Sequence, residues 1–396
     1  MIIKHPSPSK AETHPWVSFR LDLNRLLPGH WVLLGECSSK IQYVIGTPLL
    51  PELAKRLNRI YLSKGVHGTA AIEGNTLTEQ QVGLRLQGEL ELPPSQEYLG
   101  REIDNLQRAY AQITAGIQDA TRKLVTDAEI KEFNATVLSG LPLDDDVTPG
   151  EYAKKQHGVA RYRAPTPADI RVLMPTLVDW LADDTWEYDL ASPFAIPILR
   201  AIMAHLYIAW IHPFGDGNGR TARLLEADLL ARCGVPAISY HILSSHYNQT
   251  RSEYYRVLGR TSAIPEGDPL AFIDYALQGL VDGLRKQVTE IKAQHRAVVW
   301  RDFVYDHFRD AGAERRARLT RLAIDLSSQE EAVPRSKLWV ITQRVAELYQ
   351  GRTPKTISRD IGELLRARLV RREGNGYVAN VERIEAFEPS ARDRAH

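Results

Sequence analysis

The most constraining feature of the sequence is a loop of twelve residues, His212 to Arg223, that reads His-Pro-Phe-Gly-Asp-Gly-Asn-Gly-Arg-Thr-Ala-Arg. An apolar run, 194–211, precedes the loop, and a segment rich in helix-forming residues, 224–232, follows it. The pattern therefore predicts a short loop that ends one buried helix and begins another. The start of a helix presents free backbone N–H groups and the positive end of a dipole, so this loop can bind an anion.

The residues at the start of the second helix suit a phosphate ester. Gly217 and Gly219 let the backbone approach a phosphate closely and adopt dihedral angles that other residues avoid. Arg220 and Arg223 are three residues apart, so both lie on one face of the first turn, and each offers a planar fork to phosphate oxygens.

Two further side chains of the loop could take part in chemistry. Asp216 is a hard oxygen ligand of the kind that Mg²⁺ prefers, and His212 is the residue type that acts as a general base near neutral pH. The alternative is a glycine-rich surface turn with a solvated aspartate and two exposed arginines. The presence of a base, a metal ligand and two phosphate-binding side chains in one short loop favours the chemical interpretation.

The loop matches His-x-Phe-x-Asp-Gly-Asn-Gly-Arg-x-x-Arg at every defined position, and by this signature the chain resembles the Fic (filamentation induced by cAMP) family. Most members are adenylyltransferases that move AMP from ATP to a hydroxyl of a target protein. The resemblance implies that His212 is the catalytic base, that Asp216 holds Mg²⁺, and that Phe214 anchors the loop in the core. It implies nucleotide-binding roles for Gly217, Asn218, Gly219, Arg220, Thr221, Arg223, Tyr254 and Tyr255.

The resemblance also gives these residues separate tasks. Asn218 and the neighbouring amides would form the anion hole, Arg220 would bind the β-phosphate and Arg223 the γ-phosphate. One tyrosine of the pair Tyr254 and Tyr255 would stack on the adenine, with Tyr255 slightly favoured.

A second motif lies at Thr69-Ala-Ala-Ile-Glu-Gly. Taken alone, it is a helix end with a surface glutamate, Glu73, and a glycine cap, Gly74. It is similar to the regulatory motif of the family, a Ser or Thr, then three residues of any type, then Glu, then Gly or Asn. That similarity implies an inhibitory helix whose Glu73 pairs with Arg223.

Residues 149–167 match the place of a β-hairpin that the family calls the flap, whose edge pairs with the target protein. Arg161 and Tyr162 are the predicted target-binding residues. Relatives often have an arginine where this chain has Ala153, which leaves the target preference open.

The composition of the chain narrows the classes of protein to which it can belong. A net charge of +1, 43% hydrophobic residues and 25% charged residues are ordinary for a globular protein, so any basic patch must be local. Cys37 and Cys233 do not suggest a disulfide framework, and we find no signal peptide. The run 194–211 contains Pro, Arg and His, so a buried helix is favoured over a membrane span. We expect a cytoplasmic protein with no membrane contact.

The remaining segments predict mainly helices. We expect irregular structure with short helices or strands over residues 1–50, and helices over 98–117, 126–138 and 170–181. A long helix is expected from Asp268, with an apolar stripe that either packs in the core or forms a dimer seam.

Near the C-terminus the pattern predicts two helices and a hairpin, 341–378, which together make a winged helix. Basic residues predominate over acidic ones between Gly351 and Arg372, which suits DNA, although winged helices also dock on proteins.

We therefore expect a mainly α fold: an N-terminal helical region (1–100), a Fic-type core with a hairpin flap (101–290), a winged helix (291–389) and a tail (390–396). The predicted activity is ATP- and Mg²⁺-dependent adenylylation of a target protein and of the chain itself, with removal of AMP by the same site as a further activity. One alternative is a DNA-binding regulator that only senses nucleotide. Another is a Fic enzyme that moves UMP, phosphate or phosphocholine. A homodimer is a further alternative.

Overall fold

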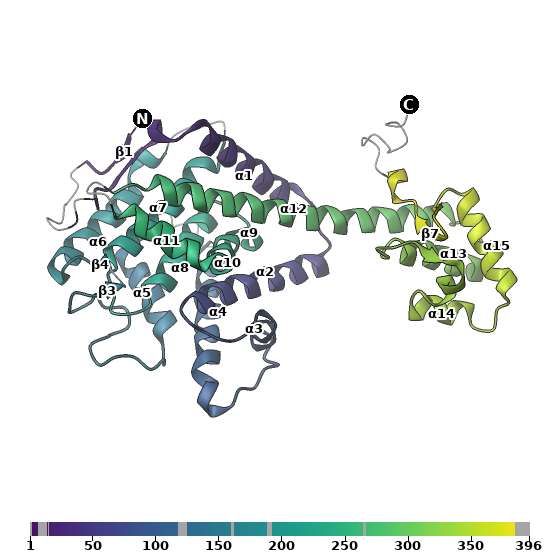
Figure 1. Cartoon of the computed structure of the whole chain (residues 1–396), viewed down its shortest axis with the longest axis horizontal. Coiled ribbons are helices and arrows are strands. Elements are labelled where there is room, and N and C mark those ends of the chain that lie inside the picture. The colour runs from purple at the N-terminus through teal and green to yellow at the C-terminus, as the bar shows by residue number, and fades with distance from the viewer. Residues whose placement is uncertain are drawn as a thin grey trace. The chain divides into compact units, whose positions relative to one another are not determined.

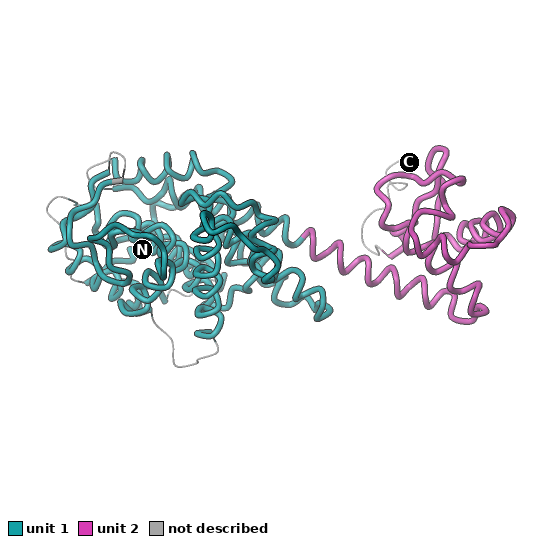
Figure 2. Tube along the Cα trace, turned by 90° about the horizontal axis from the view of Figure 1, so that it is seen from below, with its two compact units in different colours: residues 1–288 teal, residues 289–396 magenta. Residues whose placement is uncertain are grey.

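The computed structural model describes residues 2–6, 14, 16–117, 125–159, 162–187, 192–263 and 267–384. The chain divides into two compact units, residues 1–288 and residues 289–396 (Figure 2). The described secondary structure is mainly helical with three small sheets, which confirms the expected mainly α class (Figure 1).

The N-terminal 100 residues do not form a compact unit of their own, because their apolar side chains join the same core as the residues up to Leu284. The predicted tail, 390–396, lies outside the described residues.

The first unit is built from helices. They are α1 (Pro28–Gly46), α2 (Pro51–Ile72), α3 (Glu79–Leu86), α4 (Glu97–Ile117), α5 (Asp127–Leu138), α6 (Pro167–Ala182), α7 (Ala195–Ile211), α8 (Asn218–Arg232), α9 (Ala237–Tyr240), α10 (Ile242–Gln249), α11 (Arg251–Thr261) and α12 (Leu270–His307), which continues past the division between the units. Short 3₁₀ helices are η1 (Leu23–Arg25), η2 (Pro94–Gln96) and η3 (Asp184–Trp186).

Two antiparallel pairs of strands complete the first unit. Strand β1 (Ile2–Lys4) pairs with β2 (Arg20–Asp22), and β3 (Gly158–Val159) pairs with β4 (Tyr162–Arg163). The second pair is the predicted flap hairpin, with Val159 opposite Tyr162.

Helices α7 and α8 form the centre of the core. The apolar run that precedes the signature loop becomes α7, and nearly all of its side chains are buried. A helix that is apolar on all sides must be surrounded by protein or lipid, and here α1, α6 and α8 pack around it. No helix in the described part of the chain has the length and apolarity that a membrane span requires. The interpretation of 194–211 as a buried helix is therefore confirmed.

The expectation of irregular structure over residues 1–50 is wrong in one respect. Residues Pro28–Gly46 form a helix of 19 residues, which begins with Pro28 at a position where proline favours a helix start. Its apolar and polar residues are only weakly separated into faces, because Val32 and Ile45 are exposed while His30 and Ser38 are buried. That mixed pattern is why helical periodicity did not reveal it.

The predicted apolar stripe on α12 packs within the chain. Ile273, Leu277, Leu280 and Leu284 are all buried in the core of the first unit. The stripe therefore provides core packing, the first of the two alternatives, and is not available as a dimer seam.

The second unit has a hydrophobic core of its own. Its elements are α13 (Ala313–Leu326), β5 (Val333–Pro334), η4 (Arg335–Val340), α14 (Gln343–Tyr349), α15 (Pro354–Arg366), β6 (Val370–Glu373), β7 (Gly376–Ala379) and η5 (Val381–Ile384). The strands form an antiparallel sheet in the order β5-β7-β6. A buried pair between Arg318 Nε and Asp360 Oδ2, 2.9 Å apart, joins α13 to α15. The sequence predicted α14, α15 and the β6–β7 hairpin but not α13 or β5.

Candidate active site

The signature loop is a rigid connection between α7 and α8. Helix α7 ends at His212, whose backbone is left-handed (φ 48°, ψ 58°), an uncommon conformation for a residue with a Cβ. Two hydrogen bonds close the loop: Phe214 N donates to Asn218 Oδ1 (2.9 Å), and Asn218 Nδ2 donates to Phe214 O (2.7 Å). Phe214 is fully buried, as expected of a core anchor. Gly217 caps α8 with φ 75°, where a side chain would be strained.

The side chain of Asn218 fastens the signature loop, because both of its polar atoms bind the backbone of Phe214. The backbone N–H groups in the first turn of α8, which begins at Asn218, are available to an anion. The place of Asn218 in an anion hole stays a prediction. Thr221 is fully buried and its hydroxyl lies 3.4 Å from Asn134 Nδ2, so the structure gives it a structural contact.

His212 is held in its neutral form. Burial lowers the pKa of His212 to about 4, although the nearby carboxylate of Glu73 acts in the opposite direction. A neutral imidazole can accept a proton from a hydroxyl at physiological pH, as a general base must.

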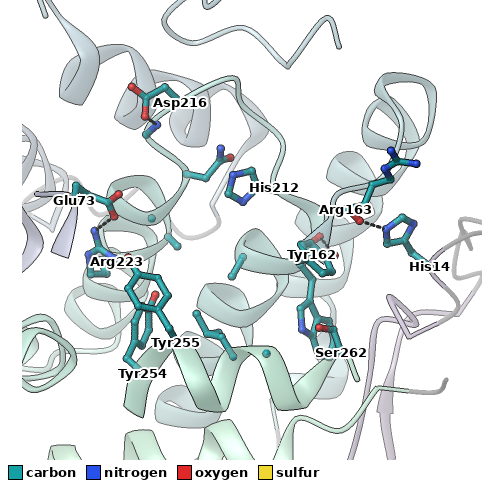
Figure 3. Close-up of a pocket in the computed structure, with 18 of the residues that line it drawn as sticks. His14, Glu73, Tyr162, Arg163, His212, Asp216, Arg223, Tyr254, Tyr255 and Ser262 are labelled. Atoms are coloured by element: carbon teal, nitrogen blue, oxygen red, sulfur yellow. Dashed lines mark hydrogen bonds and ion pairs between the residues drawn. The ribbon is translucent and has the colours of Figure 1, made fainter. Parts of the chain in front are cut away.

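Glu73 and Arg223 meet in the structure, as Figure 3 shows. Glu73 Oε1 lies 2.5 Å from Arg223 Nη2, which also donates to Thr69 O at 3.1 Å. Burial acts to raise the pKa of Glu73, but the charge and hydrogen bond of Arg223 together with the charge of Arg220 outweigh it, so the net pKa is lowered and the carboxylate is ionised. Arg223 Nε and Nη1 are buried without a hydrogen-bond partner among the described residues. The guanidinium therefore keeps donors that an anion could use.

Arg220 lies behind the loop. Its Nη1 lies 2.7 Å from Glu102 Oε1, its Nη2 lies 3.1 Å from Asp216 Oδ1, and the residue is buried. Asp216 and Arg223 line the cleft, whereas Arg220 does not. The predicted contact between Arg220 and a β-phosphate stays a prediction.

A cleft of ≈ 1320 Å³ opens above the loop. His212, Gly217, Asn218 and Gly219 form one part of its lining, and Tyr254 and Tyr255 form another. The two tyrosines differ in exposure. Tyr254 is buried and its hydroxyl lies 2.9 Å from His205 Nε2, whereas Tyr255 is 45% exposed. Tyr255 thus has the more accessible ring of the two, and stacking of either tyrosine on an adenine stays a prediction.

The flap hairpin borders the same cleft. Tyr162 lines it and donates its hydroxyl to Trp210 O. Arg161, the other predicted target-binding residue, lies outside the described residues. Ala153 is buried and its N–H donates to Pro213 O at 2.8 Å, so the segment before the flap is fastened to the signature loop.

Comparison with known proteins identifies this arrangement. Residues 124–230, from the start of α5 to near the end of α8, match the model of the Fic/DOC family. The chain carries a Fic domain. A Fic domain signaling protein from Bacteroides thetaiotaomicron has a similar structure, with a TM-score of 0.55 and 27% identity, over 66% of this chain and 97% of the other. A Fic family protein from Desulfovibrio desulfuricans shares the fold over 92% of this chain, with a TM-score of 0.54 and 19% identity.

Curated relatives of the Fic domain carry the name protein adenylyltransferase. One from Drosophila willistoni is 33% identical over 53% of this chain and 38% of its own length. One from Caenorhabditis elegans is 28% identical over 57% of this chain and 41% of its own length. The chain spans about two fifths of the length of these relatives.

Some residues around the Fic domain's cleft gave no signal in the sequence. His14 and Trp16 line the cleft from the N-terminal segment, and His14 Nε2 lies 2.7 Å from Arg163 O. Asn134 on α5 is fully buried and binds both Asp216 O (2.9 Å) and Gly150 N (3.0 Å), which fixes the loop to the segment before the flap. These contacts join segments far apart in the chain, so no local motif marks them.

The donor set of the Fic domain fits Mg²⁺ carried by a polyphosphate. Among the described residues there is no cluster of three or more His, Cys, Asp or Glu side chains that could hold a metal without further ligands. Mg²⁺ instead binds through one or two carboxylates together with substrate phosphates. Asp216 offers one half-exposed carboxylate beside the start of α8, where phosphates would bind.

Proposed function

We propose that the chain is a protein adenylyltransferase that moves AMP from ATP to a Ser, Thr or Tyr hydroxyl of a target protein or of the chain itself, and that Glu73 restrains it. The observation that carries the proposal is the contact between Glu73 and Arg223 in the same cleft as a neutral His212. The names of the curated relatives support the reaction.

The residues have the following tasks in this proposal. His212 takes the proton of the acceptor hydroxyl as its oxygen bonds to the α-phosphorus of ATP, and pyrophosphate leaves. The N–H groups at the start of α8 and the guanidinium of Arg223 hold phosphate oxygens. Asp216 would hold Mg²⁺, which offsets the charge of the phosphates when bound.

Glu73 restrains the reaction because its ion pair with Arg223 takes up the guanidinium that would otherwise bind the γ-phosphate of ATP. A carboxylate at this place adds negative charge beside the γ-phosphate, so ATP binds with its α-phosphate out of line with the acceptor. Removal of AMP from a modified protein is a further proposed activity of this site, with Glu73 orienting the water.

The identity of the donor can be tested with the Glu73→Gly variant. We expect incubation with ATP and Mg²⁺ to add the mass of one or more AMP groups to the protein. UTP and CDP-choline are the matched controls for the other donors, and adenosine alone controls for binding without transfer. Addition of a UMP or phosphocholine group in place of AMP would contradict the proposal.

A second proposal concerns the second unit, which we propose is a winged helix that binds duplex DNA. Lys355, Arg359 and Arg366 are exposed along one face of α15. Arg359 Nε lies 4.0 Å from Asp360 Oδ1, and the described contacts give no ion pair to Lys355 or Arg366. Such a row of cations suits a phosphate backbone. The test is titration of the whole protein with duplex DNA at low salt. Absence of binding there would favour docking on a protein.

The proposed location is the cytoplasm. Cys37 and Cys233 are the two cysteines of the sequence, and both are free thiols in the structure, as is usual in a reducing compartment.

A further inference from the structure

A buried carboxylate outside the signature, Glu102 on α4, is bound on both of its oxygens. Oε1 accepts from Arg220 Nη1 at 2.7 Å, and Oε2 accepts from Asn75 Nδ2 at 2.8 Å. The residue is 8% exposed. Burying a carboxylate costs several kcal/mol unless it is paired and hydrogen-bonded. Glu102 can therefore lie in the core only because these two partners bind it.

Arg220 connects this carboxylate to the candidate metal ligand. Its other terminal nitrogen, Nη2, lies 3.1 Å from Asp216 Oδ1, and Gly217 N donates to the same oxygen at 2.5 Å. Both contacts of the Asp216 carboxylate with the described residues are therefore made by Oδ1. Oδ2 has no described contact and is left for a ligand, and Asp216 lines the cleft whereas Arg220 does not.

Asn75 extends the connection to the inhibitory turn. It lies two residues after Glu73, donates to Leu99 O at 3.1 Å as well as to Glu102, and accepts from Leu77 N at 3.0 Å. Glu102 thus joins the turn that carries Glu73 to the loop that carries Asp216.

We infer that Glu102 is a positioning residue for the metal site: through Arg220 it fixes the carboxylate of Asp216 in the orientation that receives the divalent cation. The inference rests on the proposed function, because it concerns the cation that accompanies the nucleotide. Loss of a residue that orients a metal ligand typically weakens metal binding by about 10–100-fold.

Direct measurement of cation binding tests this inference without relying on turnover. Mn²⁺, detected by electron paramagnetic resonance, is titrated into native protein and Glu102→Gln in the presence of saturating ATP. The amide keeps the shape of the side chain but loses its charge. We expect Glu102→Gln to bind Mn²⁺ roughly tenfold or more weakly.

Glu97→Gln is the matched control. It makes the same substitution on the same helix and also loses an arginine partner, Arg85, 3.0 Å away. It should bind Mn²⁺ as native protein does. Equal Mn²⁺ affinity in native protein and Glu102→Gln would overturn the inference while leaving the proposed function intact. Absence of ATP-dependent Mn²⁺ binding in both native protein and Glu73→Gly would overturn the proposed function as well.

A double variant separates positioning from general stability. If Glu102 acts only through Arg220, then Glu102→Gln combined with Arg220→Gln should bind Mn²⁺ as weakly as Arg220→Gln alone. This pair also removes both buried charges together, so the test remains valid if Glu102→Gln alone fails to fold with an unpaired arginine. Additive losses of affinity in the double variant would contradict the inference.

Discussion

At the scale of single residues, His212 has two energetically unfavourable features that a purely structural residue would lack. Its backbone is left-handed, and its imidazole is partly buried, so that protonation is disfavoured. Both follow from its place at the end of α7, where the chain must turn sharply into the signature loop. The result is a neutral base that faces the cleft with little freedom to move.

We predict that His212→Ala abolishes transfer and leaves ATP binding largely intact. The base takes a proton only as the new bond forms, so its loss falls on the chemical step, by about 10²–10⁴-fold. Single-turnover rates and equilibrium binding of ATP, both in the Glu73→Gly background, check this. Modification at an unchanged rate would show that another group is the base.

The second residue-scale prediction concerns pH. The base is active in its neutral form, and burial lowers the pKa of His212 to about 4 in the free protein. Neutral imidazole therefore persists as pH falls below 6.5 and is lost only toward pH 4. The negative charge of Glu73 raises the pKa of His212, and Glu73→Gly removes it. His212 in this variant should therefore not titrate at a higher pH than in native protein.

The measurement is kcat/KM for ATP between pH 5 and 8 with Glu73→Gly, because kcat/KM reports the free enzyme. We expect no decline centred near pH 6.5. A half-maximal value close to pH 6.5 would mean that His212 titrates as an ordinary, exposed histidine.

At the scale of elements, the proposed restraint by Glu73 depends on how closely α2 packs against α10. Two glycines on α2 permit this approach: a Cβ at Gly65 would overlap the ring of His241, and a Cβ at Gly68 would lie 2.6 Å from Ser244 O. Gly68 is five residues before Glu73, on the same helix. The position of the Glu73 carboxylate is thus set by backbone contact between two helices.

We predict that Gly68→Ala destabilises the protein and partly releases the restraint. Since the neighbouring atom belongs to the backbone, α2 itself must shift, at a cost of about 1–3 kcal/mol. Thermal unfolding and auto-adenylylation should show a lower melting temperature and a higher rate. The control is Gly35→Ala in α1, where a Cβ meets no atom within 4 Å. It should leave the rate unchanged, and an unchanged rate in Gly68→Ala as well would disprove the link between packing and restraint.

The sequence predicted those elements of the site that are local. The glycines and charged residues that mark the signature loop are adjacent in the sequence. Its position between two helices could therefore be predicted from neighbouring residues alone. Glu73 and Arg223 are 150 residues apart, and only resemblance to a family brought them together. Glu102 and Arg220 are 118 residues apart and belong to no common motif, so their pairing required the three-dimensional structure.

At the scale of the whole molecule, the chain combines a Fic domain unit and a second unit with a separate core. The residues proposed for transfer all lie in the first unit, and the exposed basic row on α15 lies in the second. This separation implies that substitutions on α15 should not affect chemistry in the cleft.

We predict that Arg359→Ala combined with Arg366→Ala leaves auto-adenylylation unchanged and weakens binding to duplex DNA of any sequence. Loss of two phosphate contacts should also reduce the salt dependence of binding, since fewer counterions are released. Titrations at several salt concentrations check this in the full chain. An unaltered salt slope would place the DNA contact elsewhere, and a loss of transfer would contradict the separation of tasks.

The central claim is that Glu73 restrains an adenylyltransferase through Arg223, and one comparison tests it most directly. Auto-adenylylation is measured with ATP and Mg²⁺ for native protein, Glu73→Gly and Glu73→Gly/His212→Ala. We predict that Glu73→Gly is roughly tenfold or more faster than native protein, equivalent to about 1.4 kcal/mol in the effective barrier, and that the double variant is inactive. Equal rates for native protein and Glu73→Gly would contradict the claim and leave Glu73 as a structural ion pair at the end of a helix.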